Sequence, residues 1–465
     1  MTRISRPATR EIIEDFAKEV RNRRLDTVKP STWVINFRTD LQDGIERKVY
    51  RVPIEVLRFR KDNGRISSDV LDYEYRYGVL REDTQETQRI LSEFLYQKDP
   101  EKTNALSRSI VHGGQREPAI VTCDGFLING NRRRMVLERL HGEHPETEQF
   151  AYMACVILPG AEDEGGPPTL KEIEKLENRY QLQSDGKSEY YGFDRALSIK
   201  RKIDLGLSLE EQLRDDPRYA KADKKEIERA IKQAETDYLE PLKCVDRYLR
   251  QFGREGQYRT VSTGMSDHEG RWQALADYSR MHSRYLANPK RRLEYGIDET
   301  EVGTIEESAF DIIRLRTIPD MPKVHVIMRD LPKYCKTAGG KKEIMKIASE
   351  VDPLLPEGEL YDDQGEPLDV ATVEAKWQSR NKEAIIHRVK KASKVHESNR
   401  ERETPMQLLD AAYKKLTHDD MDIASIAATD LKDARELASS IKVRADEIES
   451  EVFHLIKAKK KLLGE

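Results

Sequence analysis

The residues best suited to bind a ligand lie at the start of a predicted helix. Its first turn is rich in arginine and comes directly after a glycine. Gly130, Asn131, Arg132 and Arg133 follow an apolar run, and a glycine lets the backbone approach a ligand closely. We predict a helix from Asn131 to about Leu140. The N–H groups of its first turn and its guanidinium groups would converge on one point, which suits phosphate. The alternative is a surface helix with a solvated basic turn.

Two short apolar runs precede this helix. Ala119–Val121 and Phe126–Ile128 flank the pair Asp124-Gly125, and such a pair between apolar runs is a strong hairpin signal. The sequence therefore predicts a strand, a tight turn and a second strand that leads into the basic helix.

These segments resemble the amino-terminal domain shared by ParB chromosome-partition proteins and sulfiredoxin. In that family a strand, a hairpin and a "GxRR" loop precede a helix and form the phosphate-binding motif. Further signatures of the family stand here in the same order, namely Val52–Leu57 with Asn63-Gly64-Arg65, Leu106–Ile110 with Gly113-Gly114, and Leu176–Gln181. The resemblance covers roughly residues 45 to 200 and implies a small mixed α+β domain.

The resemblance also implies a ligand and the residues that bind it. The nucleotide would be CTP or ATP, bound by Arg65, Gly130, Asn131, Arg132 and Arg133. In ParB proteins a Glu and an Asn help to hold the metal ion of the nucleotide, and the matching residues here are Glu177 and Asn178. Hard oxygen ligands of this kind suit Mg²⁺. The alternative for Glu177 and Asn178 is an ordinary exposed helix end.

The sequence departs from the family at two places. Sulfiredoxin chemistry needs a cysteine directly after the loop glycine, and Asn131 stands there, which excludes that activity. ParB proteins usually have Glu at this position. In addition, the segment Ile66–Thr103 is longer than in the family, and we expect it to cover the pocket or to form a partner surface.

Composition describes a helix-rich chain that is not membrane-embedded. The 465 residues are 36% charged, with a mean hydropathy of −0.77. No run of about 18 apolar residues occurs, so we expect no membrane span. The first 25 residues lack the apolar core of a secretory signal, and the four cysteines are scattered, so we expect a reducing, cytoplasmic location and no zinc module.

The chain divides into five expected regions. Proline and glycine in 159–168 mark a linker, after which Thr169 and Glu172 form a capping box that starts a helix. We predict an α+β protein: a ParB/sulfiredoxin-like mixed domain, then a mostly α-helical part with a long carboxyl-terminal helix. The regions are a charged helical leader (1–44), the nucleotide-binding domain (45–160), a helix-turn-helix-like region (169–260), a helical middle (261–352) and a coiled-coil tail (370–465).

Binding of double-stranded DNA must come from local basic patches, because the net charge is −4. Glu226–Ala234, a short break and Asp237–Leu249 resemble the helix-turn-helix that follows the ParB nucleotide domain. Thr236 would cap the second helix, and Lys243, Arg247 and Arg250 are the candidate DNA contacts. Generic all-α packing is the alternative.

The tail carries apolar residues at three-four spacing, which is typical of a coiled coil and predicts a homodimer. The seam residues are Leu431, Ala434, Ala438, Ile441, Ala445, Ile448, Val452 and Leu455. The alternative is an intramolecular hairpin whose first helix starts near Pro405.

Three functional hypotheses follow. The first is a ParB-like nucleotide-binding, DNA-associated protein that acts as a dimeric clamp or switch, with or without nucleoside triphosphatase activity. The second is a phosphotransferase or nuclease on the same fold, in which Glu174 or Glu177 would be the general base. The third is a non-catalytic binding subunit of a mobile-element or antiphage defence system.

Overall fold

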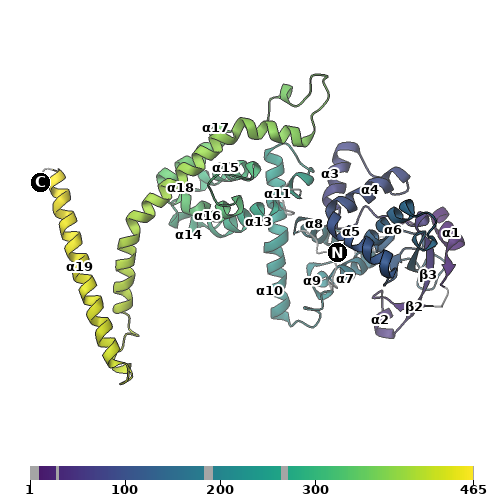
Figure 1. Ribbon diagram of the computed structural model, residues 1–465, viewed down its shortest axis with the longest axis horizontal. Helices are drawn as coiled ribbons and strands as arrows, with labels where there is room; N and C mark the ends of the chain where they lie inside the picture. Colours follow the sequence, from purple (N-terminus) through teal and green to yellow (C-terminus); the bar gives the residue numbers. More distant parts are fainter. Residues whose placement is uncertain (1–9, 28–30, 183–191, 263–270, 464–465) are drawn as a thin grey trace, which may run out of the picture. The chain divides into compact units, whose positions relative to one another are not determined.

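The computed structural model describes residues 10–27, 31–182, 192–262 and 271–463 (Figure 1). The fold is α+β, with a mixed six-stranded sheet in the amino-terminal part and helices after it. The chain divides into two compact units, residues 1–396 and 397–465. In the described ranges, no helix has both the length and the apolar character needed to cross a membrane.

The sheet is built around β3 and β6. Its strand order is β1-β3-β6-β4-β5, with β2 also pairing with β3. Neighbouring strands are antiparallel except β4 and β6, which are parallel. The strands are β1 (Leu25–Asp26), β2 (Thr32–Val34), β3 (Glu46–Pro53), β4 (Ala119–Val121), β5 (Leu127–Asn129) and β6 (Tyr152–Ile157).

Alternating residues of the central strands supply two separate cores. Ala119 and Val121 belong to one apolar cluster together with Met135. Ile120, between them, belongs to another cluster together with Ile173. Successive side chains of a strand point to opposite faces, so each face of the sheet is covered by its own helices. The predicted hairpin is confirmed, with β4 antiparallel to β5 and Gly125 at φ +84° in its turn.

In the part of the chain that the structure describes, seven α-helices belong to the sheet-containing part. The predicted capping box is confirmed, because the Glu172 N–H donates to Thr169 Oγ1 at 3.1 Å and the Thr169 N–H donates to Glu172 at 2.8 Å. The helices are α1 (Glu14–Arg23), α2 (Asp40–Asp43), α3 (Ser67–Tyr77), α4 (Gln85–Lys98), α5 (Pro100–Gly113), α6 (Asn131–Glu143) and α7 (Leu170–Leu182).

The long segment Ile66–Thr103 forms α3, α4 and the start of α5. Part of it packs into the core, since Leu91 and Phe94 join the cluster on one face of the sheet. The Lys98 ammonium, on a side chain that is 13% exposed, lies 2.9 Å from Asp69 of α3 and 2.8 Å from Asp194 of the helix that follows α7. This segment therefore connects the sheet-containing part to the helices after it.

The helical part shares one apolar cluster, to which Trp272, Leu275, Tyr278 and Met281 of α13 contribute. The elements are α8 (Gly192–Asp204), α9 (Leu209–Arg214), α10 (Lys224–Ala234), the π-helical turn η3 (Glu235–Leu239), α11 (Glu240–Gln251), α12 (Arg259–Ser262), α13 (Trp272–Met281), the π-helical turn η4 (His282–Leu286), α14 (Pro289–Glu294), α15 (Val302–Leu315), α16 (Val324–Cys335) and α17 (Ala338–Glu350).

The break predicted between the two helices of a helix-turn-helix is wrong. Helix α10, η3 and α11 follow one another without a turn, and Figure 1 shows them as one rod. Thr236, the expected cap, instead donates from its hydroxyl to the Lys232 carbonyl at 2.8 Å. A π-helical turn absorbs the change in hydrogen-bond register, so the chain does not need to change direction there.

Helix α18 (Val370–Leu416) carries a carboxylate, Glu374, that joins it to three arginines of the helical core. Glu374 accepts from Arg254 at 2.7 Å, from Arg314 at 2.9 Å, and from Arg271. These three arginines are buried and come from distant parts of the chain. The pKa of Glu374 is about 2, because the nearby guanidinium groups outweigh the effect of burial.

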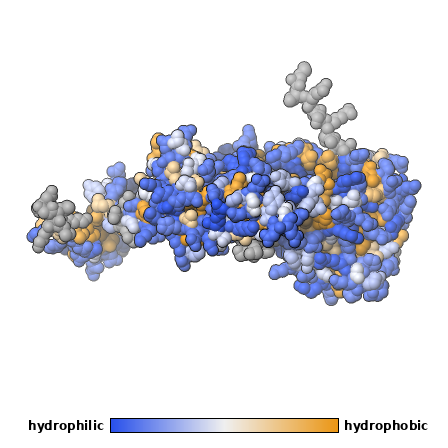
Figure 2. All heavy atoms as spheres, turned by 90° about the horizontal axis from the view of Figure 1, so that it is seen from above, coloured by the Kyte–Doolittle hydropathy of each residue, from blue (hydrophilic) through white to orange (hydrophobic). Residues whose placement is uncertain are grey.

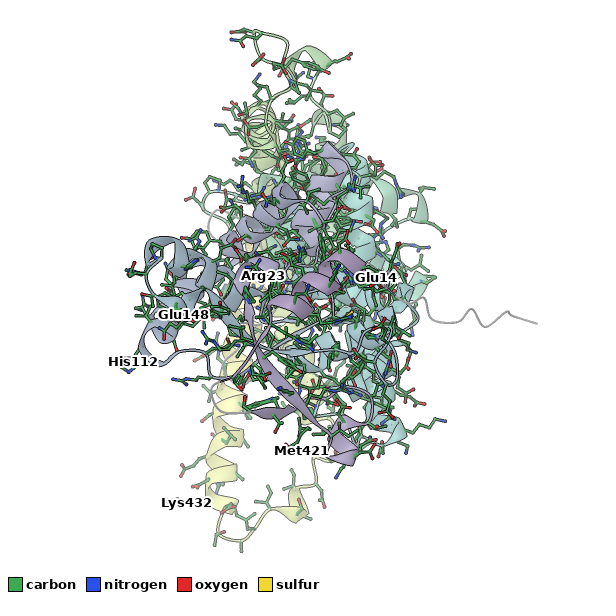
Figure 3. All side chains as sticks on the ribbon, turned by 90° about the vertical axis from the view of Figure 1, so that its right-hand side faces the viewer. Glu14, Arg23, His112, Glu148, Met421 and Lys432 are labelled. Carbon is green, nitrogen blue, oxygen red and sulfur yellow. The ribbon has the colours of Figure 1, made fainter. Side chains whose placement is uncertain are left out.

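The second unit, residues 397–465, consists of the end of α18, a connection, and α19 (Leu431–Leu463). Met421 and Lys432, labelled in Figure 3, mark the connection. Helix α18 passes through Pro405 without ending, so no helix starts there as the hairpin alternative would have it. No described residue of this unit is buried, and many of its apolar side chains are exposed. Figure 2 shows exposed hydrophobic residues scattered among hydrophilic ones on the face that it draws.

Replacing Trp377 of α18 by Ala should lower the free energy of unfolding by about 3–5 kcal/mol, because this side chain is fully buried. The same change at Met406, which is exposed on the same helix, should cost less than about 0.5 kcal/mol. Chemical denaturation followed by circular dichroism measures both values. Equal losses for the two variants would contradict the contrast between the packed and unpacked parts of α18.

Candidate functional site

A pocket of about 530 Å³ lies where α5, α6 and α7 meet the strand ends. Six of the seven predicted nucleotide and metal residues line it, namely Arg65, Gly130, Asn131, Arg132, Arg133 and Glu177. The seventh, Asn178, does not. Segments that lie far apart in the sequence thus meet at one cavity, as the sequence predicts.

Gly130 fixes how the chain enters α6. Its φ is +100°, in the region that favours glycine. A Cβ atom there would lie 2.8 Å from Ala119 Cβ and 2.9 Å from Met153 Cε. Since Gly130 has no side chain, α6 has no side-chain cap. The first-turn N–H groups of a helix have no intrahelical partner, so this end is suited to an anionic ligand.

The three consecutive arginines of α6 have different surroundings. Arg132 and Arg133 line the pocket, and the Arg133 guanidinium donates to the Glu117 carbonyl. Burial lowers the pKa of Arg133 from its ordinary value. Arg134 instead faces the core, where its guanidinium donates to the Ile54 carbonyl at 3.3 Å and stacks 4.1 Å from the Phe59 ring centre. Arg134 is therefore a structural residue.

Helix α5 supplies a wall of the pocket that sequence reasoning missed. Lys102, Ala105, Leu106 and Ser109 line the cavity, and their three-four spacing places them on one helix face. This spacing could have been read from the sequence. With Arg65, Arg116, Arg132 and Arg133, Lys102 makes the lining rich in cations, and the apolar side chains of α5 provide a contact surface for an uncharged group.

Asn131 carries an acceptor that the protein does not use. Its side-chain Oδ1 is buried and has no hydrogen-bond partner. An unpaired buried acceptor costs free energy comparable to a lost hydrogen bond, about 1–3 kcal/mol. Because Asn131 lines the pocket, a bound donor or cation would satisfy this atom.

Glu177 belongs to the pocket wall and also to a buried ion cluster. Its carboxylate accepts from the Gly64 N–H at 3.2 Å and from Arg60 at 3.3 Å. Arg60 also donates to Glu174 at 3.0 Å, and Arg201 of α8 donates to the other oxygen of Glu174 at 2.7 Å. Burial alone would raise the pKa of Glu177, but Arg60 and Arg201 hold it below its usual range. Glu177 is therefore an ionised, hydrogen-bonded carboxylate.

Asn178 faces away from the pocket toward α8 and α9. Its Oδ1 accepts from the Lys202 ammonium at 3.0 Å, and its amide donates to the Gln212 carbonyl at 3.0 Å. An ammonium group at this oxygen disfavours a divalent cation there. Across the described ranges, no three His, Cys, Asp or Glu side chains cluster to hold a metal. The structure thus brings Glu177, but not Asn178, to the site where Mg²⁺ is predicted.

The predicted DNA-contact residues lie on α11 and differ in accessibility. Arg247 makes two 2.9 Å hydrogen bonds to Glu306. The Lys243 side chain is 67% exposed and the Arg250 side chain 70% exposed. Lys243 pairs with Glu240 of the same helix at 2.8 Å and Arg250 lies 3.9 Å from Glu255, so both can reach a phosphate without breaking a bidentate ion pair.

No family model, no curated protein and no solved structure matches the chain. The ParB-like resemblance therefore stays a prediction.

The buried Lys202 gives a pH test of the region behind the pocket. Burial lowers its pKa to about 8, against 10.5 for an ordinary lysine. Between about pH 8 and pH 10.5 the unfolded state binds more protons than the folded state, so folding stability gains from a pH increase. The stability of the protein relative to its Lys202→Met variant should therefore rise across that window.

Urea denaturation of the two proteins from about pH 7.5 to about pH 10 measures this difference. Lys200→Met serves as the control, because the Lys200 side chain is 53% exposed. A difference for Lys202→Met that stays flat or falls with pH would contradict the buried, pKa-shifted ammonium.

Proposed function

We propose that the pocket at the start of α6 binds a nucleoside triphosphate, CTP or ATP. The observation that supports this most is the convergence of Arg65, Arg132 and Arg133 with the uncapped helix end at Gly130 on one cavity. Guanidinium groups and helix-start N–H groups are strong phosphate ligands. The apolar face of α5 is suited to the base or sugar. A pocket of about 530 Å³ falls in the range of small-molecule sites.

Mg²⁺ remains part of the proposal with a changed ligand set. Glu177 and Asn131 are the predicted residues that bring side-chain oxygens to the pocket, and Mg²⁺ prefers oxygen ligands. When bound with the nucleotide, the ion would neutralise phosphate charge.

Binding is favoured over the phosphotransferase or nuclease alternative. Glu174 is buried, pairs with Arg60 and Arg201, and does not line the pocket. Glu177 lines the pocket, but its pKa is lowered by the same cations, which makes it a weak general base. These surroundings support a nucleotide switch or a non-catalytic binding subunit, as in a mobile-element or antiphage system, more than an acid–base enzyme.

Replacing Arg133 by Ala should weaken nucleotide binding about tenfold to a hundredfold, because a charge-assisted phosphate contact contributes roughly 1.5–3 kcal/mol. Calorimetry with CTP, ATP, GTP and UTP, each with Mg²⁺, measures the dissociation constants. Arg108→Ala is the matched control, since Arg108 is an exposed α5 arginine outside the pocket lining. Absence of binding by the parent protein to every nucleotide would refute the proposal.

We further propose that Lys243 and Arg250 contact double-stranded DNA. Both are exposed on α11, and α10 carries four more exposed basic residues, Lys224, Lys225, Arg229 and Lys232. The continuous rod from α10 through α11 thus presents basic side chains along its length.

Charge reversal of both Lys243 and Arg250 to Glu should weaken duplex binding and reduce the slope of log K against log salt by about 2, because two phosphate contacts are lost. Fluorescence anisotropy at several salt concentrations measures this slope. Reversal of Lys290 and Arg291 on α14 changes the net charge equally and should leave the slope unchanged. If the α11 variant binds like the parent, the α10 residues become the better candidates.

The second unit supports the proposal of a homodimer held by α19. Fifteen large apolar side chains between Met406 and Ile456 are exposed, and among them are the predicted seam residues Leu431, Ile441, Val452 and Leu455. The seam is therefore not buried within the chain, as an intramolecular hairpin would require. Burial of apolar area contributes about 25 cal/mol per Å², so a second α19 would be stabilised on this face.

Ile441→Glu combined with Ile448→Glu should convert the dimer to a monomer, because charged residues at seam positions would be buried without partners. Light scattering coupled to size exclusion measures the mass. Ser440→Glu, outside the predicted seam, should leave the dimer intact. A monomeric mass for the parent protein would contradict the proposed dimer.

A further inference from the structure

A second cavity lies between α11, α15 and the end of α17, apart from the nucleotide pocket. Its volume is about 520 Å³. Polar and charged side chains form one part of its wall, namely Arg247, Arg250, Gln251, Glu306, Glu307 and Asp311. The apolar part of the wall includes Phe310, Ala348, Val351 and Pro353.

Asp311 is unusual among the buried acids of the described chain. Eleven Asp and Glu residues are buried there, and ten of them form an ion pair with Lys or Arg. Asp311, which is 2% exposed, forms none and accepts only a long 3.4 Å hydrogen bond from Gln251. Buried carboxylates are normally paired with a cation. Asp311 has no such partner among the described side chains, so its carboxylate is suited to a cation from outside the protein.

The nearby arginines do not fill this role. Arg247 is held by Glu306, which also accepts from the Tyr278 hydroxyl at 3.2 Å. Arg314 is directed to Glu374 and to the Pro353 carbonyl. Arg250 is 70% exposed and lies 3.9 Å from Glu255. Burial raises the pKa of Asp311 to about 8, as expected for an acid without a partner.

A second carboxylate and an apolar surface in the same cavity indicate which kind of cation would fit. Glu307 is exposed and stands one helical turn before Asp311 on α15. Residues at this spacing have Cβ atoms about 5–6 Å apart. Phe310, Val351 and Pro353 offer apolar contact beside the two carboxylates. Methylene groups pack on such a surface while a charged end reaches a carboxylate.

We propose that this cavity binds a short aliphatic diamine, with one ammonium group on Asp311 and the other on Glu307. The chain between the two nitrogens lies against the apolar side of the cavity. A metal ion fits less well, because the neighbouring Glu306 is already engaged by Arg247 and the apolar part of the wall offers it no ligand.

Calorimetry of the full chain with 1,4-diaminobutane and with 1-butylamine tests the proposal. Asp311→Asn should weaken binding of both amines at least tenfold. Glu307→Gln should remove the advantage of the diamine over the monoamine and leave monoamine affinity unchanged. Asp330→Asn, a carboxylate on α16 outside the cavity, is the control and should have no effect.

Amine affinity should also rise with pH, since Asp311 must release its proton to pair with an ammonium group. The increase should approach tenfold per pH unit below about pH 8 and level off above it. The charged groups that face Asp311 come from α11 and α15 and are Arg247, Arg250, Glu306, Glu307 and Arg314. The part of the wall from α17 and the residues after it is uncharged.

Two results would overturn the proposal: no heat with either amine in the parent protein, or equal affinity of the parent and Asp311→Asn. Circular dichroism of Asp311→Asn separates a lost site from a lost fold, and the neutral, nearly isosteric residue should keep the folded spectrum. Because this cavity lies apart from the α6 pocket, Arg133→Ala should leave amine binding unchanged, so the outcome is independent of the proposed nucleotide function.

Discussion

The pairing of Arg60 with Glu174 and Glu177 is the constraint on which the pocket at the start of α6 depends. All three side chains are buried, and Arg201 of α8 joins them. Removing such charges from water costs several kcal/mol per ion, so the cluster is tolerated only with its partners in place. Since Arg60 follows β3, Glu174 and Glu177 lie on α7, and Arg201 lies on α8, one set of contacts holds the pocket loop, the pocket wall and the first helix of the helical part together.

This constraint makes the pocket preorganised. Glu177 accepts from the Gly64 N–H, which fixes the loop that carries Arg65, and the Glu117 carbonyl holds Arg133. Side chains that are already ordered lose less conformational freedom when a ligand binds. A ligand would therefore not have to order the arginine side chains of the pocket when it binds, which lowers the entropy cost of binding.

Local patterns in the sequence predicted the elements around the pocket. Contacts between side chains that lie far apart in the sequence could not be predicted. The turn at Asp124-Gly125, the glycine before α6 and the Thr169 capping box depend on residues within a few positions, so their patterns are visible in the sequence. The partner of Asn178 is Lys202, on another helix, and no spacing rule identifies it. The missing turn at Thr236 has a similar cause, because η3 contacts α8, and no local pattern in the sequence identifies that partner.

The contact between Glu374 and its three arginines also has a consequence for the order in which the chain is made. Glu374 is synthesised after its three partners, Arg254, Arg271 and Arg314. Until Glu374 has left the ribosome, these guanidinium groups lack the carboxylate that pairs with them in the core. A nascent chain that ends before α18 would keep these groups hydrated and the helical part incompletely packed. The helical core would thus close late in translation, when the ribosome has already released most of the sheet-containing part to fold.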